Sequence, residues 1–199
     1  MTKKTKDEEI VRTRVRRAYE LGNTGGNIAL WRSALSELRE LIRDESVEVR
    51  RAAASGLEQL WWTGDDLTIF ALSQVLKNSN EDSEVRSKVA LALAEYIPVL
   101  DKSPGANLKS IKGIRQDALD ILIETLKEAD LEVVEYAVVA LGNIQDQNTV
   151  TPMINALQNR SVQVLETAIQ AIDRLEPTAV RSKMRKALEE LLDTREEEQ

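Results

Sequence analysis

The chain has 199 residues, of which 42% are hydrophobic and 31% charged, a composition typical of a folded globular protein. Its formal net charge is −7, which argues against general nucleic-acid binding, because phosphate affinity depends on Lys and Arg. It contains no Cys and no His, which excludes disulfides, thiol nucleophiles and a histidine general base.

Helix-forming residues dominate the sequence, and Gly and Pro number only 8 and 4. Asn27 and Asp82 are suited to cap the helices that follow them, and Asn148 or Thr149 is suited to cap the helix that contains Pro152. We expect a helix over residues 6–21, helical hairpins over 28–61, 65–97, 115–145 and 149–175, and a last helix over 177–195. Between the second and third hairpins, residues 98–114 have no periodicity and predict a loop insertion.

The second helix of each hairpin carries the same apolar stripe, with residues at i, i+4, i+8 and i+11. This spacing places all four residues on one face of a helix, which predicts that they face a core. Four copies of one stripe predict a repeat protein. The copies are Val49, Ala53, Leu57 and Leu60; Val85, Val89, Leu93 and Tyr96; Val133, Ala137, Leu141 and Ile144; and Val164, Ala168, Ile172 and Leu175.

Two strings resemble short HEAT-like repeats of the type found in phycobilin lyases and phycobilisome-associated factors. They are D-x-x-x-x-V-R-x-x-A-x-x-x-L at residues 44–57 and A-L-G-x-I at residues 140–144. The resemblance covers about residues 28–175 and implies an all-α fold, an α–α superhelix (a right-handed HEAT-like repeat solenoid) with helical caps, as one domain over 1–199. In that family the Arg of the V-R pair bridges to acidic groups of neighbouring turns. The resemblance therefore implies Asp44 as a partner of Arg50 or Arg86.

In HEAT-type solenoids the second helices line the concave side, so positions 2, 3, 6, 9 and 10 after each first stripe residue are expected to face a groove. Leu91, Tyr136 and Val139, with Ala94, would form an apolar patch there with a polar rim, as binding surfaces do. Alternatively, residues 98–114 fold over this patch, or a tight superhelix buries it. The candidate partner-binding residues are Arg51, Lys88, Leu91, Glu95, Glu135, Tyr136, Val139, Asn143, Glu166 and Gln170.

Two further features have a structural and a functional interpretation. Trp61 and Trp62 are adjacent and therefore about 100° apart on a helix, so we expect one to complete the core and the other to point elsewhere. The first helix has a basic face of Arg12, Arg14, Arg16 and Arg17, which is either the outer face of a cap or a contact for an acidic partner.

The sequence contains no phosphate-binding, dinucleotide-binding or nucleophile-elbow motif, and no catalytic group can be singled out among its acidic residues. We therefore expect a non-catalytic scaffold or adaptor that binds a protein partner through the concave face, with no cofactor, metal or nucleic acid. The alternative, implied by the resemblance, is a phycobilin lyase-like or phycobilisome-associated factor that binds a bilin or a phycobiliprotein. If the chain is an enzyme, the resemblance implies a lyase that attaches bilins. With no secretory signal and no run of about 18 apolar residues, we expect a cytoplasmic protein that does not enter membranes.

Overall fold

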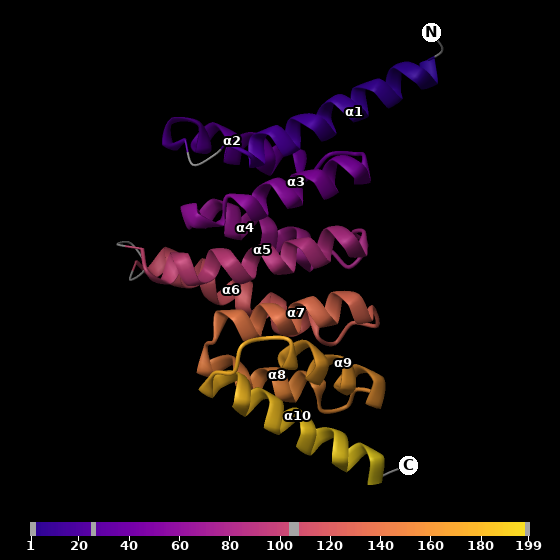
Figure 1. Cartoon of the computed structure of the whole chain (residues 1–199), viewed down its shortest axis with the longest axis vertical. Coiled ribbons are helices and arrows are strands. Elements are labelled where there is room, and N and C mark those ends of the chain that lie inside the picture. Colours follow the sequence, from indigo (N-terminus) through magenta and orange to yellow (C-terminus); the bar gives the residue numbers. More distant parts are fainter. Residues whose placement is uncertain (1–2, 25–26, 104–107, 198–199) are drawn as a thin grey trace.

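A computed structural model of the chain describes residues 3–24, 27–103 and 108–197. These residues form ten α-helices and two short 3-10 helices and contain no strand, which confirms the predicted all-α class (Figure 1). The helices are α1 (Lys3–Gly22), α2 (Ile28–Leu41), α3 (Val47–Gln59), η1 (Trp61–Thr63), α4 (Asp66–Lys77), α5 (Ser83–Asp101), α6 (Lys109–Thr125), α7 (Leu131–Ile144), η2 (Gln147–Thr149), α8 (Val150–Leu157), α9 (Val162–Asp173) and α10 (Ala179–Glu197).

The helices form two stacked layers that follow the long axis of the molecule (Figure 1). In the odd layer, α1 packs against α3, α3 against α5, α5 against α7 and α7 against α9. In the even layer, α4 packs against α2 and α6, and α6 packs against α8. The last helix, α10, closes the C-terminal end against α9 and α8. Because each hairpin contacts mainly its neighbours, the chain is a helical repeat solenoid, as predicted.

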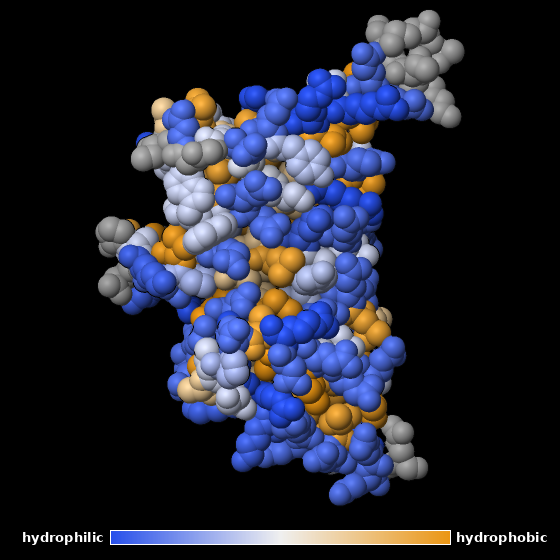
Figure 2. Space-filling model, viewed as in Figure 1, coloured by the Kyte–Doolittle hydropathy of each residue, from blue (hydrophilic) through white to orange (hydrophobic). Residues whose placement is uncertain are grey.

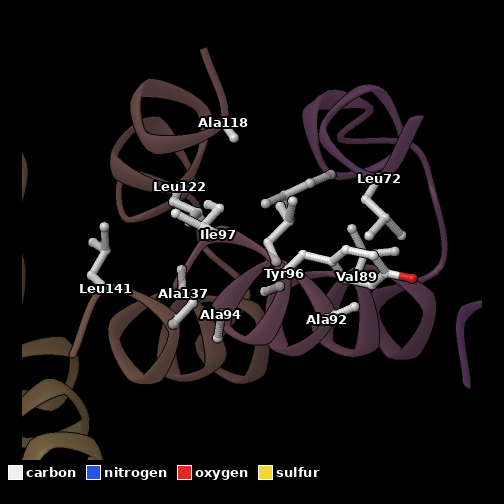
Figure 3. Packing of buried hydrophobic residues seen from close by; sticks show 14 of the residues in the cluster. Leu72, Val89, Ala92, Ala94, Tyr96, Ile97, Ala118, Leu122, Ala137 and Leu141 are labelled. Carbon is white, nitrogen blue, oxygen red and sulfur yellow. The ribbon is translucent and has the colours of Figure 1, made fainter. Parts of the chain in front are cut away.

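The core lies between the two layers and is built from the predicted stripes. Their residues are buried in all four copies, apart from Leu175, which is half-buried. In Figure 3, Leu72 of α4 points toward Val89 and Tyr96 of α5 across this core. The two layers are therefore joined by side chains whose positions the helical period dictates.

Asparagine and aspartate side chains begin several helices. Asn27 accepts a hydrogen bond from the Ala29 amide at 3.0 Å, and Asp82 accepts one from the Val85 amide at 3.1 Å, as predicted. Thr149, one of the two predicted caps, occupies the N-cap position of α8, but its side chain makes no capping hydrogen bond there. Asp146 instead accepts a hydrogen bond from the Asn148 amide at 2.9 Å and begins the 3-10 turn η2 ahead of α8. Such caps satisfy amide groups that a helix start leaves unpaired.

The predicted loop over residues 98–114 is wrong at both ends. Helix α5 continues through Pro98 to Asp101, and α6 begins at Lys109; residues 104–107 lie outside the described residues. Proline removes one backbone hydrogen bond from a helix, but Ile97 and Leu100 remain on the buried face and hold this last turn against the core. Packing therefore overrides the local signal that Pro98 gives.

The expectation that Trp61 or Trp62 completes the core is also wrong. Leu60 is the last buried residue of this segment, and the side chains of Trp61 and Trp62 are 41% and 37% exposed. Because α3 ends at Gln59, the two tryptophans lie on a 3-10 turn rather than on the helix. The Trp62 ring meets the Trp31 ring of α2 edge to face, with 6.4 Å between the ring centroids.

The arginines of the two V-R pairs have structural roles, but their acidic partners differ from the one predicted. Arg50 forms an ion pair with Glu81 at 2.7 Å and donates to the backbone carbonyl oxygen of Asp44. The Asp44 carboxylate instead pairs with Arg14 of α1 at 2.8 Å. Each arginine thus reaches an acidic residue in the turn of the next repeat, because stacking brings that turn alongside.

Candidate functional site

The exposed surface of α3, α5, α7 and α9 forms one continuous stripe, which we call the odd-helix face. These helices are buried against both neighbours and against the even layer, so side chains reach solvent along one narrow side of each helix. The odd-helix face comprises the exposed or half-buried residues one position before, and 2, 3, 6, 9 and 10 positions after, each first stripe residue: Glu48, Arg51, Ser55, Glu58, Gln59, Glu84, Lys88, Leu91, Glu95, Glu132, Glu135, Tyr136, Val139, Asn143, Gln163, Glu166, Thr167, Gln170, Asp173 and Arg174.

The ten candidate partner-binding residues all lie on this face. Four other positions expected in the groove are buried instead, namely Ala52, Ser87, Ala94 and Gly142. They are small residues in the layer of odd helices, where neighbouring helices approach closely: a Cβ on Gly142 would lie 2.6 Å from the Leu175 side chain. The open stripe is therefore narrower than predicted.

The centre of the odd-helix face is apolar. Leu91 of α5 and Val139 of α7 are half-buried and stand at the same position of their stripes, six residues after Val85 and Val133. Tyr136 lies one turn before Val139 and packs against the core with it. Figure 2 shows hydrophobic surface at the level of α5 and α7, with hydrophilic surface around it. The solenoid thus leaves this patch partly open, although Ala94 is not part of it.

Several polar candidates are held by other residues of the chain. Arg51 pairs with Asp82 at 2.6 Å and with Glu84 at 2.9 Å, and Arg174 pairs with Glu135 at 2.5 Å. Asn143 accepts a hydrogen bond from the Arg181 side chain at 2.9 Å. These contacts fix the rim of the face in one arrangement.

The odd-helix face carries more carboxylates than cations. Burial raises the pKa of Glu58 above its ordinary value; Glu95 adds to this rise and Lys88 opposes it. Glu58 on α3 and Glu95 on α5 therefore influence each other across the helix boundary. In the part of the chain that the structure describes, neither forms an ion pair within 4.0 Å.

The structure also contains a hollow that was not predicted from the sequence. It is an open groove of about 1140 Å³ along α1, lined by Asp7, Glu8, Val11, Arg12, Val15, Arg16, Tyr19 and Glu48. Val11, Val15 and Tyr19 stand at i, i+4 and i+8, so the sequence did contain the signal for an apolar stripe here. The expected single basic face of this helix is divided: Arg14 and Arg17 pair with Asp44 and Glu37, while Arg12 and Arg16 line the groove.

Two family models match the sequence of this solenoid. The model described as HEAT repeats matches residues 5–94, and the model described as PBS lyase HEAT-like repeat matches residues 133–159. The chain contains HEAT-like repeats. The first match begins within α1, which agrees with the packing of α1 as a member of the odd layer.

Solved structures with a similar fold include an engineered protein and designed armadillo repeat proteins. An engineered protein has a TM-score of 0.53 at 19% identity, with 94% of this HEAT-like chain and 92% of that chain covered. A designed armadillo repeat protein in complex with the peptide (KR)4 has a TM-score of 0.53 at 20% identity, with 94% of each chain covered. Computationally designed armadillo repeat proteins for modular peptide recognition give 0.50 at 20% identity, with 94% and 92% covered. These likenesses concern the fold. No curated protein matches the chain.

The described part of this HEAT-like protein contains no group of three or more acidic side chains placed to hold a metal ion. None of its helices is both long and apolar enough to cross a lipid bilayer.

Proposed function

We propose that this HEAT-like solenoid is a non-catalytic scaffold that binds a protein partner through the odd-helix face. The observation that carries the proposal is the pair Leu91 and Val139, two partly exposed apolar side chains at the same level of adjacent helices. Apolar side chains at the centre with charged ones around them are the usual anatomy of a protein interface. The fold is similar to that of designed armadillo repeat proteins made for peptide recognition, which is consistent with this role.

The test is affinity capture from the native host with three forms of the full chain. The first is the unaltered protein, and the second carries Leu91→Asp with Val139→Asp. The third carries Leu67→Asp with Phe70→Asp, a matched control because these side chains of α4 are 56% and 46% exposed in the even layer. We expect the Leu91/Val139 variant to fold and to lose at least one protein that the other two forms retain. Equal capture by all three forms would contradict the proposal.

A second candidate rests on the match to the PBS lyase HEAT-like repeat model over residues 133–159, which include Tyr136 and Val139. In this alternative, the same face binds a bilin or a phycobiliprotein. The test is the visible absorption spectrum of a bilin mixed with the purified protein. A shifted spectrum that Tyr136→Ala abolishes would support it, whereas an unchanged spectrum would count against bilin binding.

A further inference from the structure

We propose that the partner segment bound by the odd-helix face carries lysine or arginine side chains next to apolar ones. This inference rests on the proposed function and specifies the chemistry of the partner. Two observations support it. One is the set of charges around the apolar centre, and the other is how many of those charges are already neutralised by other residues of the chain.

The odd-helix face has eight carboxylates and three cations. The carboxylates belong to Glu48, Glu58, Glu84, Glu95, Glu132, Glu135, Glu166 and Asp173, and the cations to Arg51, Lys88 and Arg174. All three cations already have acidic partners within the chain: Arg51 with Asp82 and Glu84, Lys88 with Glu84, and Arg174 with Glu135. The face therefore has no cation left to receive an acidic ligand.

Five of the carboxylates form no ion pair within 4.0 Å among the described residues: Glu48, Glu58, Glu95, Glu132 and Glu166. Helix α3 carries two of them and α5, α7 and α9 carry one each, so unneutralised negative charge extends along the whole face. Opposite charges across an interface steer association and select the partner. A segment with phosphate groups or acidic side chains would meet repulsion along the same line.

The free carboxylates lie close to the apolar centre. Glu95 follows Leu91 by four residues, which puts it on the same side of α5 one turn away, at about 6 Å along the axis. Glu58 stands at nearly the same level of the neighbouring helix α3, nine residues after Val49, whereas Glu95 stands ten residues after Val85. A segment that places an apolar side chain on Leu91 therefore brings its neighbouring side chains within reach of Glu58 and Glu95, where a cation relieves their mutual repulsion.

Helix spacing sets the register of the segment. Packed helices lie about 8–10 Å apart, whereas a chain in the polyproline II conformation advances about 3.1 Å per residue with three residues per turn. Three residues therefore span the distance from one odd helix to the next, and every third side chain points to the same side. In this conformation a twelve-residue peptide of four Leu-Lys-Ser units would present a leucine to each of α3, α5, α7 and α9, with a lysine beside it.

The experiment measures binding of this fluorescently labelled peptide, (Leu-Lys-Ser)4, to the full chain by anisotropy, next to (Leu-Glu-Ser)4 as the acidic counterpart. The test variant is Glu58→Lys with Glu95→Lys. The control variant is Glu40→Lys with Asp117→Lys, which makes the same charge change at two exposed positions of the even layer. At about 50 mM salt we expect the test variant to bind the basic peptide about tenfold more weakly, and the control to change less than about twofold. At about 0.5 M salt the difference should nearly vanish.

Tighter binding of the acidic peptide, or equal weakening in both variants, would overturn the inference. If the lysine pair lowers the thermal stability, Glu58→Gln with Glu95→Gln is used instead, with an expected weakening of about threefold. The outcome also separates this inference from the proposed function. If neither peptide binds while Leu91→Asp with Val139→Asp still loses its native partner, the face is an interface and only its preference for basic segments is refuted.

Discussion

Arg86 of α5 forms a two-pronged ion pair with Glu128, which lies in the turn between α6 and α7. The Arg86 side chain is only 3% exposed, and its guanidinium also donates to the Leu76 carbonyl oxygen at 2.8 Å and 3.1 Å. One side chain thus joins α4 and α5 of one repeat to the turn of the next repeat. In the next repeat Val134 stands at the position of this arginine. There the repeats are linked by Arg160, in the turn before α9, which donates to the carbonyl oxygens of Lys127 and Glu128 in the turn of the preceding repeat.

Removal of the Arg86 side chain is expected to be costly. Arg86→Ala leaves Glu128 and the Leu76 carbonyl oxygen without their buried donor, so we expect the free energy of unfolding to fall by about 2–3 kcal/mol. Lys127→Ala is the control, because its pair with Glu124 is exposed at both ends, and its effect should stay below about 0.5 kcal/mol. Urea unfolding measures both values; similar losses would contradict the structural role of Arg86.

The contact between α1 and α3 depends on a pair of glycines. A Cβ on Gly22 would lie 2.6 Å from the Cα of Gly56, and backbone atoms cannot yield there as a flexible side chain does. Gly22→Ala should therefore force the two helices apart and cost about 1–3 kcal/mol. Gly113→Ala in α6, where no atom lies within 4 Å of the new Cβ, should instead stabilise by about 0.5–1 kcal/mol. Thermal unfolding distinguishes the opposite signs, and destabilisation by both would refute this explanation.

Tyr96 is fully buried, and its hydroxyl donates to the Leu57 carbonyl oxygen at 2.9 Å. Burial is also the main reason why its pKa lies above its ordinary value. Tyr96→Phe keeps the ring and removes the hydrogen bond, so a loss of about 1 kcal/mol is expected. Tyr19→Phe, at a position that is 53% exposed, should change stability by less than about 0.5 kcal/mol. If Tyr96→Phe leaves the free energy of unfolding unchanged, the hydrogen bond makes no net contribution to stability.

Glu58 should make stability depend on pH. Burial raises its pKa in the folded state, so the folded protein favours the neutral form. The stability that this protonation provides is present at low pH and is lost as the pH rises through the folded-state pKa. Glu58→Gln should therefore raise the apparent Tm at pH 7 by about 1–2 °C, and the gain should disappear near pH 4. Glu40→Gln in the even layer serves as the control, and a Glu58→Gln gain that is independent of pH would count against burial as the cause.

The sequence predicts the stacking of this solenoid well because few alternatives satisfy its constraints. Only a helical period places Val133, Ala137 and Ile144 on one face, because a strand would turn Ile144 to the opposite side, and all three are buried. Caps such as Asp82 also follow from local chemistry, since they need only the amides of their own helix.

Features that depend on neighbouring repeats were harder to predict. Pro98 indicates a helix end, and only the burial of Leu100 explains why α5 continues. The partner of Arg50 is Glu81 rather than the Asp44 carboxylate, because the turns differ in length and their side chains meet only after stacking. For the site, the helical period identified the exposed stripe. It did not give the width of the stripe, because the burial of Ala94 depends on how closely α5 and α7 approach.

The central claim is that the odd-helix face contacts a protein partner at Leu91. Its most direct test replaces Leu91 with the photoreactive residue p-benzoyl-phenylalanine and irradiates the native host cells, with the same replacement at Phe70 of the even layer as the control. We predict a discrete protein adduct from position 91 that is absent from position 70. The absence of an adduct at position 91, or the same adducts at both positions, would contradict the claim.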